Sequence, residues 1–213
     1  MGQYYLGYTK NEILKKEIIW KNPSGLKLME HSYFGNNFVN GMCRELFGSP
    51  KRVAWVGDYA DDFYNYIVKG GDGYFNGDNS DKILDIHKLV WNENAIRTDL
   101  PTPFDNLDKY GLSDNIYYLV NHSKQEYINL HKYLENQKKQ YDNEWDLFIH
   151  PLPLLTAIGN GMGGGDYHEQ MNYEMVGYWF YDLISVASNA FIAPDEYKDV
   201  TNTTDYQFVE FNN

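Results

Sequence analysis

Residues 150–167 form the part of this chain whose composition points most directly to a function. They read HPLPLLTAIGNGMGGGDY and contain five glycines. Glycine loses more conformational entropy on folding than any other residue, so an ordered run of this kind implies a shape that only glycine adopts. Such a loop can bring backbone N–H groups up to a ligand. We therefore predict a ligand-binding loop made of Gly159, Asn160, Gly161, Gly163, Gly164, Gly165, Asp166 and Tyr167.

The glycine spacing does not match the two common phosphate-binding loops. The stretch lacks the Gly-Lys-Ser/Thr ending with which a P-loop holds phosphate and magnesium. It fits the Rossmann fingerprint only through the abundance of glycine, and no distinctive acid follows about 20 residues later. Two interpretations stay open: a backbone nest for an anion, or a tight structural crossover.

A second motif lies at residues 56–62, which read VGDYADD. Gly57, Asp58 and Asp61 match the Gly-Asp-x-x-Asp pattern with which metallophosphoesterases hold divalent metals at a strand end. The histidine-containing parts of that pattern are missing. A metal site would therefore need Asp58 and Asp61 together with Asp166 and His168 brought in by folding, and such ligands favour magnesium or manganese. The alternative is that the acids cap a helix and stay solvated.

The remaining reactive residue types carry weaker signals. Residues 70–81 are rich in Gly, Asp and Asn but do not fit the EF-hand register, so we predict a surface loop. The six histidines form no tight metal-binding pair. Cys43 lies in a helix-like pattern and is expected to be a buried structural thiol. A single cysteine permits no intrachain disulfide, which fits a reducing compartment.

Local patterns predict the elements that must position these residues. Residues 3–9 and 13–20 are β-rich and indicate a hairpin. Residues 123–140 do not indicate a single element: they begin with a capping box, Ser123 and Glu126, and only their tail, residues 133–140, is strongly helical. Residues 174–186 fit a strand or a helix. The other predicted elements are helices at 36–47 (N-cap Asn36 or Asn37), 61–69 and 82–91, and strands at 52–56, 115–121, 145–149 and 206–211. Because strands and helices mix without strict alternation, we predict an α+β fold, one domain over residues 1–213 with a largely antiparallel sheet and several short helices.

Composition narrows the classes of partner. The formal net charge is −12, so direct binding of nucleic acid is disfavoured, whereas an acidic surface can attract basic protein surfaces. Aromatic residues make up 17% of the chain and include 20 tyrosines, which suit contact surfaces as well as cores. No segment is long and apolar enough to span a bilayer, so we expect a cytoplasmic protein without a membrane partner.

Four strings resemble a family of proteins without an assigned activity from Firmicutes, their phages and their mobile elements. They are MGQYY (1–5), LKLMEHS (26–32), AWVGDYAD (54–61) and LPLLTAIGNGMGGGDY (152–167), and together they extend over most of the chain. The resemblance implies a bacterial or phage cytoplasm and transfers no catalytic residues. It also suggests that the glycine-rich loop, the segment that begins at Trp55, and the Glu30-His31 pair meet in one place.

Our leading hypothesis is a non-catalytic acidic binding protein that uses no cofactor and engages a protein partner or a small nucleotide. Its predicted ligand-binding residues are those of the glycine-rich loop together with Trp55, Glu30 and His31. The resemblance adds a role as a counter-defence factor, an inhibitor or a sponge. The alternative is a magnesium- or manganese-dependent hydrolase of a phosphorylated small molecule. A structural subunit with a tyrosine-rich oligomer interface is a third hypothesis, and the oligomeric state is left open.

Overall fold

The computed structural model describes residues 3–23, 25–61, 80–140, 146–159 and 175–204. The predicted strand at 206–211 and most of the predicted helix at 61–69 and loop at 70–81 therefore lie outside the described residues. Within them, no helix is long and apolar enough to cross a membrane.

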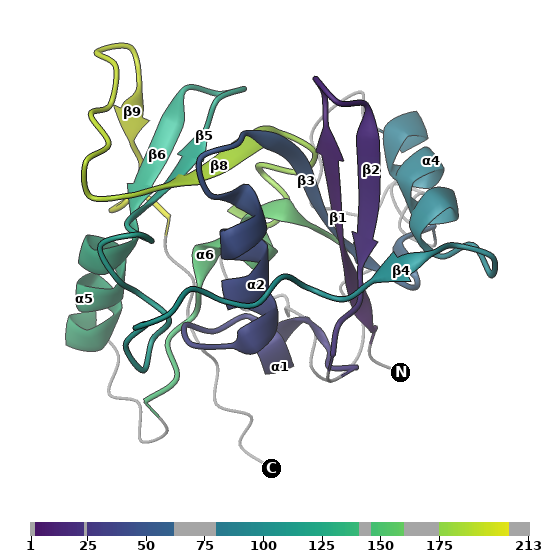
Figure 1. Ribbon diagram of the computed structural model, residues 1–213, viewed down its shortest axis with the longest axis horizontal. Helices are drawn as coiled ribbons and strands as arrows, with labels where there is room; N and C mark the ends of the chain where they lie inside the picture. The colour runs from purple at the N-terminus through teal and green to yellow at the C-terminus, as the bar shows by residue number, and fades with distance from the viewer. Residues whose placement is uncertain (1–2, 24, 62–79, 141–145, 160–174, 205–213) are drawn as a thin grey trace.

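One mixed sheet organises the molecule (Figure 1). Its strands run in the order β4-β2-β1-β3-β8-β5-β6-β9, and β7 also pairs with β3. The contacts of β2 with β4, β3 with β7 and β6 with β9 are parallel, and the others are antiparallel. The predicted α+β class with a largely antiparallel sheet is confirmed. The strands are β1 (Tyr5–Asn11), β2 (Lys16–Trp20), β3 (Lys51–Gly57), β4 (Arg97–Thr98), β5 (Tyr118–Asn121), β6 (Glu126–Asn129), β7 (Ala157–Ile158), β8 (Leu183–Ala187) and β9 (Lys198–Asp199).

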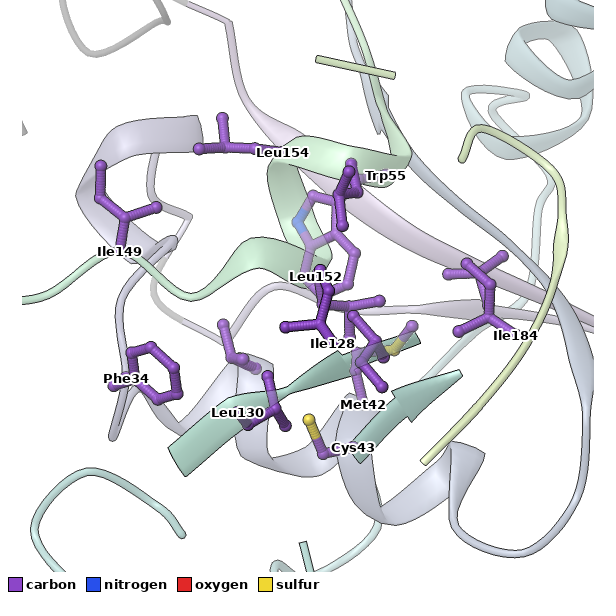
Figure 2. Close-up of a cluster of buried hydrophobic side chains, with 14 of the residues drawn as sticks. Phe34, Met42, Cys43, Trp55, Ile128, Leu130, Ile149, Leu152, Leu154 and Ile184 are labelled. Carbon is purple, nitrogen blue, oxygen red and sulfur yellow. The ribbon is translucent and has the colours of Figure 1, made fainter. Parts of the chain in front are cut away.

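Strand β3 lies at the centre of the core and is buried on both faces. Side chains alternate between the faces of a strand. Val53 and Trp55 accordingly belong to the larger hydrophobic cluster, while Ala54 and Val56 belong to the smaller one. The larger cluster is built with α1 (Leu28–His31), α2 (Asn37–Leu46), α5 (Leu130–Gln140) and α6 (Pro151–Thr156), and the smaller one with α4 (Ser80–Val90). Figure 2 shows Trp55 in the larger cluster beside Leu152 of α6.

Several elements form where local signals predicted them. The N-terminal hairpin is β1 and β2, paired from Gly7–Trp20 to Asn11–Lys16. Helix α2 begins after Asn36, whose side chain accepts a hydrogen bond from the Phe38 amide at 2.8 Å. Helix α4 begins two residues before the predicted helix at 82–91. These elements carry their own turn, cap or amphipathic signal, which explains the agreement.

Two local predictions were wrong. Ser123 and Glu126 do not cap a helix: they flank the turn from β5 to β6, and Glu126 is the first residue of β6. Residues 146–149 contain only an isolated bridge, between Ile149 and Tyr33, in place of the predicted strand. The apolar run after His150 forms helix α6, with Pro151 in its first turn, where a missing N–H costs nothing. In the ambiguous segment at 174–186, only β8 is regular.

Candidate ligand site at the ends of strands β3 and β7

Parallel pairing of β3 with β7 brings the two sequence motifs together. Trp55 lies opposite Ala157, and Val56 lies opposite Ile158. Because the carboxyl ends of parallel strands meet at one edge of a sheet, the chain leaves β3 at Asp58 and β7 at Gly159 side by side. The start of the glycine-rich stretch therefore adjoins the Gly-Asp-x-x-Asp motif. Asn160, Gly161, Gly163, Gly164, Gly165, Asp166, Tyr167 and His168 lie outside the described residues.

Gly57 and Gly159 are both needed for close packing against strand β1. Tyr5 of β1 pairs with Gly57. A Cβ atom on Gly159 would overlap the Tyr5 hydroxyl, and one on Gly57 would overlap the Gln3 side-chain oxygen. Tyr5 and Gln3 are buried, so neither side chain can move aside freely. Gly159 is the first glycine of the run, and close packing alone explains why it is a glycine. This agrees with the interpretation of the stretch as a tight structural crossover.

His31 and Trp55 form a buried hydrogen-bonded pair behind this edge. Trp55 Nε1 donates to His31 Nε2 at 2.8 Å, and both side chains are completely buried. The Phe38 ring lies 4.7 Å from the Trp55 ring and 5.4 Å from the His31 ring. Since Nε2 accepts a hydrogen bond, His31 is neutral with its proton on Nδ1. Burial lowers its pKa to about 4, and nearby backbone carbonyls of Leu26 and Lys27 offset only part of that shift.

The structure thus brings His31 and Trp55 together, as the resemblance suggested, but in the core. Neither side chain has surface with which to touch a ligand. Glu30 is exposed, and its carboxylate accepts a hydrogen bond from the Lys27 amide at the start of α1. His31 and Trp55 therefore support β3 from within the core, and Glu30 stabilises the start of α1.

Asp58 and Asp61 lie at that edge beside His87 of α4. The Asp58 carboxylate accepts the Tyr4 amide at 3.1 Å, and the Asp58 amide donates to the Tyr4 carbonyl at 3.0 Å. His87 Nε2 lies 3.0 Å from the Asp58 carbonyl oxygen, which can only accept, so Nε2 carries a proton. The same nitrogen lies 3.6 Å from an Asp61 carboxylate oxygen. Partial burial raises the pKa of Asp58.

Three residues of this edge were not predicted from the sequence: His87, Gln3 and Tyr5. His87 is an isolated histidine in an amphipathic helix, and the other two precede or begin a strand, so no local pattern marks them. Long-range pairing of β1, β3 and β7 is what brings them to the edge.

The metal-site hypothesis has no direct support in the described part of the chain. There, no group of three or more His, Cys, Asp or Glu side chains is arranged to hold a metal. Asp58 already uses its carboxylate to hold the Tyr4 backbone. The other two ligands of the hypothesis, Asp166 and His168, lie outside the described residues.

Cys43 and His150 form a second buried pair, with Sγ and Nε2 3.9 Å apart. His150 Nδ1 accepts the Leu152 amide at 3.2 Å, so the ring proton is on Nε2 and points toward sulfur. Burial raises the pKa of Cys43 to about 12 and lowers that of His150 to about 3. A nucleophilic cysteine requires a thiolate. The pair is therefore a neutral structural contact, and Figure 2 shows Cys43 among apolar side chains.

Comparison with known proteins adds no relative. No family model matches the chain, and neither the curated proteins nor the solved structures contain a match.

Proposed function

We propose that this chain is a non-catalytic binding protein whose ligand, a small nucleotide or a segment of a partner protein, binds at the edge where β3 and β7 end. The observation that carries the proposal is the parallel pairing of these two strands. In open α/β sheets, ligands bind outside the carboxyl ends of parallel strands, and the β3–β7 pair presents an edge of the same kind. Here that edge joins a glycine-rich stretch to two aspartates and a histidine.

The chemistry of the described edge favours a ligand that donates hydrogen bonds. Asp61 is exposed and Asp58 is partly exposed, and carboxylates accept hydrogen bonds from amino and hydroxyl groups. The amino group of a nucleobase, a ribose hydroxyl, or a lysine or arginine of a partner protein would fit. The net charge of −12 further favours a basic protein surface.

The two ligand classes correspond to two modes of action in a bacterial or phage cytoplasm. A nucleotide ligand would make the protein a sponge that sequesters a signalling molecule. A basic partner would make it an inhibitor that covers a positively charged surface. The counter-defence role in both modes is supported by the resemblance to the Firmicute and phage family.

A binding role accords with the state of the buried reactive groups. His31, Cys43 and His150 are each held neutral inside the core. Neutral buried side chains stabilise a fold and cannot reach a substrate. The competing hypothesis, a metal-dependent hydrolase of a phosphorylated small molecule, depends on Asp58, Asp61, Asp166 and His168 acting together.

A thermal-shift screen against a nucleotide panel and divalent metals, each with and without EDTA, tests the proposal. A ligand that binds only the folded state raises the melting temperature. We expect a nucleotide-induced shift that survives EDTA and is reduced by Asp61→Asn. The matched control is Asp105→Asn, an exposed aspartate in the connection between β4 and β5.

Other outcomes separate the alternatives. If no nucleotide gives a shift, affinity capture with wild-type and Asp61→Asn baits should identify a basic protein that only the wild type retains. A metal-dependent shift, abolished by Asp58→Ala and accompanied by phosphate release from a phosphorylated compound, would replace the proposal with the hydrolase.

A further inference from the structure

A pocket of about 400 Å³ lies between helix α5 and residues 201–204, which follow β9. The pocket lies at the end of the sheet formed by β6 and β9. In the strand order, β8 and β5 lie between that end and β3. Its volume is within the range of about 300–1,000 Å³ that is usual for small-molecule sites. It shares no lining residue with the edge where β3 and β7 end.

The pocket lining is rich in uncharged hydrogen-bonding groups. It contains four carboxamides and two threonines: Asn136, Gln137, Gln140, Asn202, Thr201 and Thr204. Lys139, an exposed residue, is the one charged side chain among the described residues that line it. The described lining therefore carries one positive charge, which is suited to a ligand with a negative group.

Hydrogen bonds within the protein fix the back and sides of the pocket. Gln137 is held at both ends of its amide: it donates to the Tyr133 hydroxyl at 2.9 Å and accepts the Ile149 amide at 3.0 Å. Asn136 Nδ2 donates to Asn202 Oδ1 at 3.0 Å and so joins α5 to the segment after β9. Walls that are fixed in advance lower the entropy lost when a ligand binds.

These bonds leave specific groups for a ligand. An amide has one acceptor oxygen and a donor nitrogen. The Asn136–Asn202 bond therefore leaves the Asn136 oxygen as an acceptor and the Asn202 nitrogen as a donor, and the described residues supply no partner for either. The Thr204 hydroxyl is buried, with 3% of the residue exposed, and it makes no hydrogen bond with any residue that the structure describes. Buried polar atoms in native proteins nearly always have a partner.

We propose that this pocket binds a small sugar that carries a phosphate group. Sugar hydroxyls both donate and accept hydrogen bonds, so they match the Asn136 oxygen, the Asn202 nitrogen and the Thr204 hydroxyl together. The Lys139 ammonium group would pair with the phosphate at the rim of the pocket. A site of this kind is separate from the edge where β3 and β7 end.

Ribose 5-phosphate is a suitable probe, and ribose and inorganic phosphate test its two halves. Titration calorimetry with the full chain should show saturable binding of ribose 5-phosphate. Asn202→Ala should weaken that binding by about fivefold or more, the usual loss for a hydrogen bond. Lys139→Gln should weaken binding of ribose 5-phosphate and leave that of ribose unchanged. Asn202 and Lys139 are exposed, so both variants should fold, and an unchanged far-UV spectrum would verify this.

Two further variants make the test specific. Asn94→Ala, at an exposed asparagine before β4, and Asp61→Asn, at the other proposed site, should both bind the sugar phosphate like the wild type. The proposal is overturned if neither sugar binds at millimolar concentration, or if Asn202→Ala binds as tightly as the wild type. It is equally overturned if inorganic phosphate alone reproduces all of the binding, because Lys139 would then be a non-specific anion contact.

Discussion

Two buried histidines approach strand β3, and they differ in their partners. His31 is completely buried, packs against Trp55 and Phe38 of the larger hydrophobic cluster, and accepts a hydrogen bond from Trp55. His87 belongs to the helix that covers the other face; it is 9% exposed and lies beside the backbone of Asp58 and the exposed carboxylate of Asp61. Both histidines hold the end of β3 in place, but only the second contacts a carboxylate that is exposed to solvent.

The difference shows how a fold divides its polar residues between support and contact. A histidine that accepts from a buried indole must stay neutral, so it can position a strand but cannot exchange protons with solvent. His87 is also largely buried, but its Nε2 lies beside an exposed aspartate that a ligand can reach. In the segment 54–61, Trp55 therefore belongs to the core, whereas Asp58 and Asp61 belong to the proposed site.

Of all the changes considered, acidification should have the largest effect, because it acts on the buried His31. The pKa of His31 is about 4 in the folded state, against an ordinary value of 6.5. Below pH 6.5 the unfolded state binds a proton that the folded state refuses, so stability falls as the pH falls from about 6.5 to about 4. The full effect of this one group is about 3 kcal/mol.

Urea unfolding across this pH range, for the wild type and for His31→Gln, measures the effect. Glutamine keeps an acceptor for Trp55 but does not titrate, so the variant should lose clearly less stability on acidification. Because His150 also titrates at low pH, only the difference between the two proteins reports on His31. Parallel pH profiles would mean that His31 is protonated in the folded state.

An added methyl group at Gly159 tests whether packing fixes the start of the glycine-rich stretch. Its Cβ atom would overlap the buried Tyr5 hydroxyl. Overpacking of this kind costs about 1–3 kcal/mol. We expect Gly159→Ala to lower the free energy of unfolding by that amount, measured by urea denaturation.

The double variant with Tyr5→Phe is the matched control. Removing the hydroxyl gives the new methyl group space, so the two substitutions should be less harmful together than the sum of their separate effects. Strictly additive effects would show that the contact between Gly159 and Tyr5 does not determine the residue type.

Local signals in the sequence predicted those elements that are stabilised locally. The Asn36 cap, the amphipathic pattern of α4 and the β-rich hairpin each contain their own information. Helix α6 was missed because it has six residues, all buried, and so it lacks a polar face that would show helical periodicity. Ser123 and Glu126 match a capping box, but pairing of β5 with β6 and β8 is stronger than that local preference.

The candidate site was predictable only in part, for the same reason. Residue types singled out Asp58, Asp61 and Gly159, and the structure places these three residues at one edge. The partners that define their roles are Tyr4, Tyr5 and His87, which come from other strands and a helix. No spacing in the sequence encodes a parallel contact between β3 and β7.

Substitutions of Asp58 and Asp61, the carboxylates beside His87, should change the free energy of unfolding least. Asp58 holds the Tyr4 amide, whereas Asp61 is exposed and lies 3.6 Å from His87. We expect Asp58→Ala to cost about 1 kcal/mol, the usual net contribution of one hydrogen bond, and Asp61→Ala to cost less than about 0.5 kcal/mol. Asp58→Asn should be nearly neutral, because its amide oxygen still accepts the Tyr4 N–H and the raised pKa of Asp58 shows that the charge is not favoured there.

Chemical denaturation of the three variants checks this order. A loss at Asp61→Ala as large as that at Asp58→Ala would mean that Asp61 supports the fold, and the proposed division between supporting and contacting residues at the end of β3 would then be wrong.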